Sequence, residues 1–111
     1  MNREVFNEVS VLWAEHRGQF CPDDLRDFEI NGQPVMLLDL YMAGCLTSYV
    51  GSRHAALSAT QLRTVRECAR DLRALLPRVR RRENRAYVAR LLRIADLVVR
   101  DAAAGDDYRE Q

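Results

Sequence analysis

Residues 58–104 read SATQLRTVRECARDLRALLPRVRRRENRAYVARLLRIADLVVRDAAA, and apolar side chains recur in this stretch every three or four residues. In the first part the apolar positions are Leu62, Val65, Ala69, Leu72 and Leu76. This spacing predicts a helix over about 58–76, capped by Ser58 or Thr60. A second helix is predicted over about 83–104, where the apolar positions are Tyr87, Val88, Leu91, Leu92, Ile94, Ala95, Val98 and Val99. Pro77 disturbs the end of the first helix, so the two helices should form a helical hairpin.

Two earlier segments should cover this hairpin. Over about 2–17 the apolar face consists of Val5, Phe6, Val9, Leu12, Trp13 and His16, and Gly18 is expected to stop the helix in a left-handed conformation. A helix over about 34–50 is the most apolar of the set. The sequence therefore predicts an all-α, four-helix arrangement (about 2–17, 34–50, 58–76 and 83–104) in one domain, 1–105, with a frayed tail at 106–111.

The segment 19–33 is acidic and irregular. Pro22 followed by two aspartates is typical of a helix start, so a short helix is expected to about Asp27. Asn31-Gly32 between apolar residues favours a β-hairpin, although Pro34 would confine its second arm to a sheet edge. A hairpin and a plain loop both remain open here.

The composition is that of an ordinary globular protein, with 48% apolar and 30% charged residues. All 17 basic residues are arginine, which indicates either a high-GC bacterial genome or guanidinium groups selected to bind anions. The three cysteines are Cys21, Cys45 and Cys68; their odd number and wide spacing argue against disulfides. Residues 1–8 lack the pattern of a secretory signal, so the expected location is the cytoplasm.

The helix over 34–50 carries more apolar surface than one packed face needs. One face consists of Val35, Leu38, Met42, Cys45, Leu46 and Tyr49, and the other holds Met36, Leu37, Leu40 and Tyr41. The start of this helix should therefore be buried nearly all round, against the hairpin arm or against another protein chain. It is too short to span a bilayer and contains Asp39. Met36, Leu37, Leu40 and Tyr41 are the candidate partner-binding residues.

Charge is divided unevenly along the chain. Residues 1–57 hold four arginines against eight acids, whereas residues 58–111 hold thirteen against eight. The candidate anion-binding residues, here called the arginine stripe, are Arg63, Arg66, Arg70, Arg73, Arg78, Arg80, Arg81 and Arg82. The stripe could bind nucleic-acid phosphates. Glu67 and the acids of 23–29 could equally neutralise it, and no aromatic residues interleave with the arginines.

No catalytic or metal-binding pattern stands out. His16 lies at the end of an apolar face and is interpreted as a capping or packing residue. Asp39 is expected to pair with an arginine from another helix, and the sequence identifies no second titratable group beside it. The histidines and cysteines include no close pair of the kind typical of zinc sites, so we expect no metal and no cofactor.

Two functions follow. The preferred one is a small non-enzymatic protein-interaction protein: a homodimer, an accessory subunit, or an inhibitor or immunity-type partner. The alternative is a nucleic-acid-associated regulator that acts through the arginine stripe.

Overall fold

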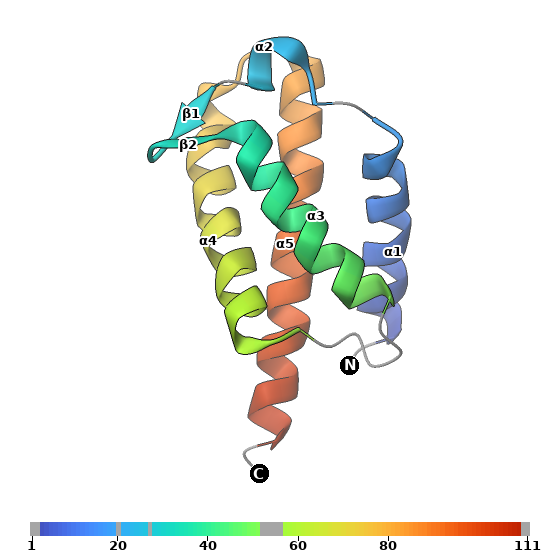
Figure 1. The fold of residues 1–111 in the computed structure, drawn as a ribbon. Helices are drawn as coiled ribbons and strands as arrows, with labels where there is room; N and C mark the ends of the chain where they lie inside the picture. Colours follow the sequence, from blue (N-terminus) through green and yellow to red (C-terminus); the bar gives the residue numbers. More distant parts are fainter. Residues whose placement is uncertain (1–2, 20, 27, 52–56, 110–111) are drawn as a thin grey trace.

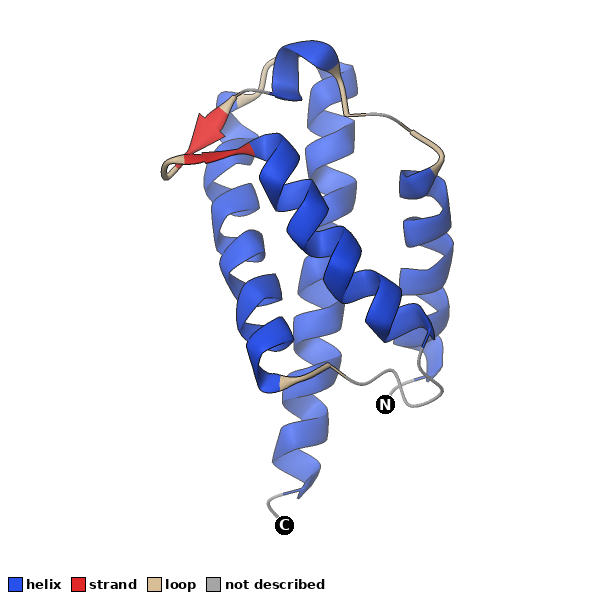
Figure 2. Ribbon diagram, viewed as in Figure 1, coloured by secondary structure: helices blue, strands red, loops and turns tan. Residues whose placement is uncertain are grey.

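The computed structural model describes residues 3–19, 21–26, 28–51 and 57–109, and its side chains as far as Ala102. The elements in chain order are α1 (Arg3–Arg17), α2 (Asp23–Arg26), β1 (Glu29–Ile30), β2 (Gln33–Pro34), α3 (Val35–Gly51), α4 (Ala59–Leu75), the 3₁₀ turn η1 (Leu76–Arg78) and α5 (Arg82–Arg109). The predicted all-α class and its long helices are confirmed (Figure 2). Asp27 lies outside the described residues, as does most of the connector between α3 and α4.

Helix α5 runs through the middle of the molecule, with α4 on one side and α1 on the other (Figure 1). Helix α3 crosses diagonally over the front of these helices, and α2 and the β-hairpin lie at one end. The core forms where the helices meet; its fully buried side chains include Val9, Leu38, Met42, Leu46, Val65, Leu72, Val88, Leu91 and Ile94. Helix α3 is thus an outer layer that covers the core with one face only.

The helical hairpin of α4 and α5 forms for local reasons that the sequence contains. Ser58 caps α4: its hydroxyl accepts from the Gln61 amide at 3.1 Å, and the Gln61 side chain accepts from the Ser58 amide at 3.0 Å. At the other end Pro77 ends the regular helix in a 3₁₀ turn. The Arg85 guanidinium donates to the Val79 carbonyl at 3.0 Å, which fixes the corner between the helices.

The segment after α2 is a β-hairpin and not a plain loop. Its two antiparallel strands pair Glu29 with Pro34 and Ile30 with Gln33. The turn needs two positive φ angles, and these fall on Asn31 (52°) and Gly32 (79°), the residue types that tolerate them. Because Pro34 lacks an N–H and ends a two-residue strand, it costs the pairing little, and α3 begins at the next residue.

Helix α1 ends at Arg17 as predicted, but the way it ends and the predicted end of the last helix are wrong. Gly18 does not adopt a left-handed conformation; α1 ends in a tight turn in which the amides of Gly18 and Gln19 donate to the carbonyls of Glu15 and His16. Helix α5 also continues beyond the expected end at 104, through Gly105 to Arg109. A glycine stops a helix when it adopts a positive φ. A glycine that keeps a helical φ is only an unfavourable helix former. That 106–111 form a frayed tail stays a prediction.

Candidate protein-interaction site

The start of α3 is not buried all round, contrary to expectation. Its packed face is the predicted one, with Val35, Leu38, Met42, Cys45, Leu46 and Tyr49 all buried. On the opposite side Met36, Leu40 and Tyr41 keep 40%, 54% and 46% of their surface exposed, and Leu37 is partly buried. We call these four residues the α3 outer face. The hairpin arm leaves them uncovered because it lies at the end of the helix and not along it.

The exposed side of α3 continues as an uncharged surface. Gly44, Thr47 and Ser48 are exposed, and the space around Gly44 is open. The hydroxyls of Thr47 and Ser48 donate to the carbonyls of Ala43 and Gly44 within the same helix, at 2.7 and 3.4 Å. The lack of charged residues on this side, together with Met36 and Tyr41, matches the charge depletion and the Met and Tyr enrichment of interface cores.

A pocket of about 350 Å³ adjoins the α3 outer face. It lies between the hairpin, α3 and α4, and its lining residues are Asn31, Gln33, Leu38, Tyr41, Thr64, Glu67, Cys68, Arg70 and Asp71. Tyr41 belongs to both features, so the apolar face leads directly into the pocket. We call this the α3–α4 pocket.

The polar groups of this pocket are centred on Asp71, whose side chain is 7% exposed. Its Oδ1 accepts from Asn31 Nδ2 at 2.8 Å and from Arg70 Nε at 3.4 Å. The Cys68 thiol beside it has its pKa raised to about 12, chiefly by burial and further by nearby groups that include Asp71 and Glu67. Cys68 is therefore a neutral packing residue and not a reactive thiol.

Part of the arginine stripe is neutralised within the chain. Arg73 pairs with Asp96 at 2.6 Å, and Arg81 pairs with Asp24 at 3.0 Å. A hydrogen bond from Asn84, together with Arg81, lowers the pKa of Asp24. These contacts tie α2 and α4 to α5, so these arginines have structural roles.

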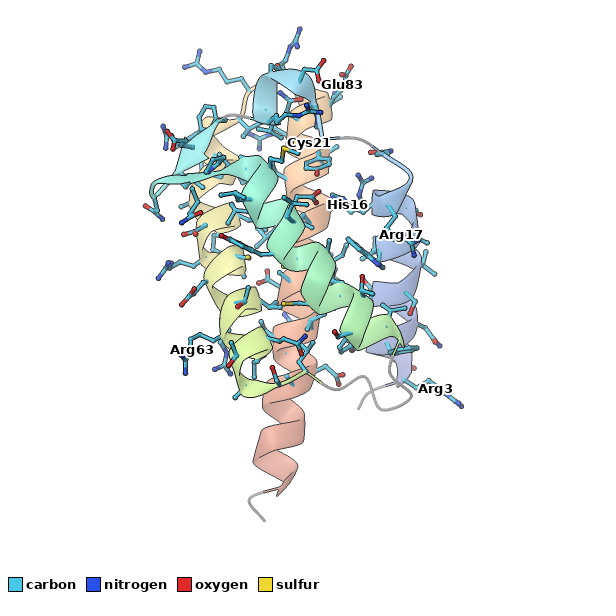
Figure 3. All side chains as sticks on the ribbon, in the orientation of Figure 1. Arg3, His16, Arg17, Cys21, Arg63 and Glu83 are labelled. Carbon is cyan, nitrogen blue, oxygen red and sulfur yellow. The ribbon has the colours of Figure 1, made fainter. Side chains whose placement is uncertain are left out.

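The remaining arginines fall into two groups along the chain. Arg78 lies 5.1 Å above the Phe28 ring and Arg70 contacts Asp71. Five arginines of the stripe lack an ion pair to any described residue: Arg63, Arg66, Arg78, Arg80 and Arg82. Arg63 and Arg66 lie in the first half of α4 and the other three lie beyond its end, so about 14 Å of helix, from Arg66 to Leu75, separates the two groups. Figure 3 shows Arg63 directed away from α3.

Asp39 pairs with a histidine and not with the expected arginine. His16 Nε2 lies 2.7 Å from Asp39 Oδ1, and Arg90 Nε donates to His16 Nδ1 at 3.2 Å. Since Nδ1 accepts that proton, Nε2 carries the ring hydrogen and donates it to Asp39. The imidazole is 3% exposed and links α1, α3 and α5, as the packing interpretation of His16 predicted. Both ring nitrogens are occupied, which leaves neither for a substrate in this arrangement.

Two further titratable groups lie beside this histidine. The Tyr87 ring centroid is 4.6 Å from that of His16, and its buried hydroxyl makes no hydrogen bond of acceptable geometry to the described residues. Burial raises the pKa of Tyr87, and the charge of Asp39 raises it further. Cys21 is labelled in Figure 3, and burial is the main cause that raises the pKa of its thiol. Neither group has the lowered pKa that an activated nucleophile needs.

The described part of the chain holds no cluster of three or more potential metal ligands and no helix long and apolar enough to cross a membrane. Comparison with known protein families, curated proteins and solved structures finds no match for this chain. The structure itself is thus the basis for any functional argument.

Sequence reasoning identified the α3 outer face but missed the pocket beside it. The Asn-Gly turn was identified only as a structural signal, although the Asn31 side chain reaches Asp71, 40 residues later. Asp71 follows Glu67 by one helical turn, so a carboxylate pair on one face of α4 was the available clue.

Proposed function

We propose that this protein is a non-enzymatic interaction protein that binds a protein partner through the α3 outer face. The observation that carries the proposal is the exposure of Met36, Leu40 and Tyr41 together on a helix whose exposed side carries no charge. Contiguous exposed apolar surface of this kind is uncommon on monomers and is typical of binding sites. The three free cysteines support the expected cytoplasmic location.

The partner we favour is a second, different protein and not another copy of this chain. The α3–α4 pocket beside the outer face holds two carboxylates against one arginine, so the binding surface combines apolar and acidic groups. A partner segment that carries apolar and basic side chains complements both. Self-association through the same face remains an outcome of the test.

A matched pair of variants tests the proposal. Leu40→Glu places a charge on the α3 outer face, and Val11→Glu places the same charge on α1, where Val11 is 59% exposed. Wild type and both variants are immobilised and exposed to an extract of the native cells, and each is examined by sedimentation velocity. We expect a retained species, or self-association, that Leu40→Glu weakens at least about thirtyfold and Val11→Glu leaves unchanged. A monomer whose retained species are the same in all three forms would contradict the proposal.

Nucleic-acid binding is supported less well. Pairing of Arg73 and Arg81 with acids interrupts the arginine stripe, and the five arginines without ion pairs to described residues fall into two groups. Binding of this kind depends on several phosphate contacts along one surface.

A further inference from the structure

The α3–α4 pocket contains a carboxylate with one unused oxygen. Both contacts of Asp71 to the described residues, from Asn31 and Arg70, end at Oδ1. Its other oxygen, Oδ2, accepts no hydrogen bond from this part of the chain. The side chain lines the pocket although only 7% of it is exposed. Oδ2 is not among the buried atoms without a partner, so it is open to the pocket and provides an acceptor for a group that enters there.

The surrounding groups favour a positively charged occupant. Glu67 stands one turn before Asp71 on the same face of α4, and Arg70 is the single basic residue of the lining. Arg70 is 70% exposed and reaches only Oδ1, at the long distance of 3.4 Å. The Tyr41 ring forms another wall of the pocket. Carboxylates together with an exposed aromatic face are the chemistry that binds guanidinium and ammonium groups.

We infer that the pocket receives a guanidinium or alkylammonium group, carried by a basic side chain of the protein that docks on the α3 outer face. This inference rests on the proposed function, because Tyr41 joins the two surfaces and a basic residue adjacent to apolar ones would occupy both. The volume of about 350 Å³ is at the lower end for ligand pockets and suits one side chain.

Small cations test the pocket without the partner. Methylguanidinium and n-butylammonium chlorides are titrated into the full chain at constant ionic strength, with sodium butyrate as the anionic counterpart. Amide NMR spectra report on Asn31, whose side-chain amide lies in the pocket. We expect saturable shifts with both cations. Glu67→Gln should weaken their binding about fivefold, whereas Arg70→Gln, which removes a competing charge, should strengthen it by a similar factor.

Both substituted side chains are exposed, so the fold should tolerate either change. Absence of saturable shifts with the cations would overturn the inference. So would cation binding that Glu67→Gln leaves unchanged, or shifts caused by butyrate alone and lost in Arg70→Gln.

The Leu40→Glu variant separates this inference from the proposed function. If Leu40→Glu leaves the species retained by wild type unchanged while the cations still bind, the pocket assignment stands and the docking proposal falls. If Leu40→Glu abolishes partner binding while no cation binds to wild type, the docking proposal stands and the pocket assignment falls.

Discussion

Substituting two leucines of α3 measures how much two different sides of this helix contribute to the stability of the fold. Leu46 is fully buried beneath the helix, whereas Leu40, on the same element and of the same chemistry, is 54% exposed. Replacing each with alanine changes the same atoms within one helix. The difference between the two losses of unfolding free energy therefore measures the difference in burial of the two side chains.

The magnitudes follow from the burial of each side chain. Leu46→Ala leaves a cavity in a packed core, which costs about 2–5 kcal/mol of unfolding free energy. Leu40 is about half buried, and complete burial of a leucine contributes about 1.5–3 kcal/mol, so Leu40→Ala should cost about 1 kcal/mol or less. For a domain of this size each kcal/mol lowers Tm by about 4–8 °C, so Leu46→Ala should lower Tm by at least about 8 °C.

Urea and thermal unfolding, followed by far-ultraviolet circular dichroism at two protein concentrations, measure both costs. Val11→Ala on α1 is the control, because Val11 is exposed to a similar extent as Leu40. Equal losses for Leu40→Ala and Leu46→Ala at both concentrations would refute the reasoning. Leu40 would then be covered within the folded monomer, and the α3 outer face would not exist as a free surface.

Further predictions concern single groups. Cys21, which is only partly buried, should react with a thiol reagent well before the buried Cys68. The Cys68 thiol should react only as fast as the protein unfolds. Because the folded pKa of Cys68 is raised from 9.0 to about 12, its stabilising contribution is complete below pH 9 and is lost as pH rises toward 12; Cys68→Ala should flatten the stability profile measured by urea unfolding in that window. The pKa of Asp24 is lowered from 3.8, so its contribution is present above pH 4 and is lost as the pH falls further; Asp24→Asn should destabilise at pH 7, and urea unfolding should show this difference from wild type shrinking as the pH falls below 4. Filter binding of nucleic acid by the arginine stripe should be weak at low salt and absent at moderate salt; tight retention in both would favour the regulator hypothesis.

The periodicity of the sequence was sufficient to predict the long helices because the spacing of the apolar residues within each helix defines its buried face. The spacing of Leu62, Val65, Ala69 and Leu72 requires no knowledge of the neighbouring helix. The capping pair of Ser58 and Gln61 is equally local, since both hydrogen bonds span three residues. The same local logic failed at Gly18, because a glycine permits a left-handed stop without requiring one.

The site depends on contacts that no local pattern contains. His16 and Asp39 are 23 residues apart in sequence, and Arg90 is 74 residues from His16. Their meeting depends on α3 crossing in front of α1 and α5, and the period of a helix does not specify which helix lies beside it. The same holds for Asn31 and Asp71, which lie together only because the hairpin packs at the end of α4. The apolar outer face could be predicted because it is a property of α3 alone.

The position of α3 argues that its surface has a use besides folding. Helix α3 is the most apolar helix of the chain, yet it lies on the outside, while the central position belongs to the more polar α5. If stability were the sole requirement, the exposed side of an outer helix would be expected to carry charged residues, as the exposed side of α4 does with Arg63, Arg66 and Glu67. Sequence positions that break such a residue pattern without improving the packing are expected at functional sites. The uncharged side of α3 is such a departure from the pattern, and the two carboxylates of the pocket at its edge complement a positively charged group.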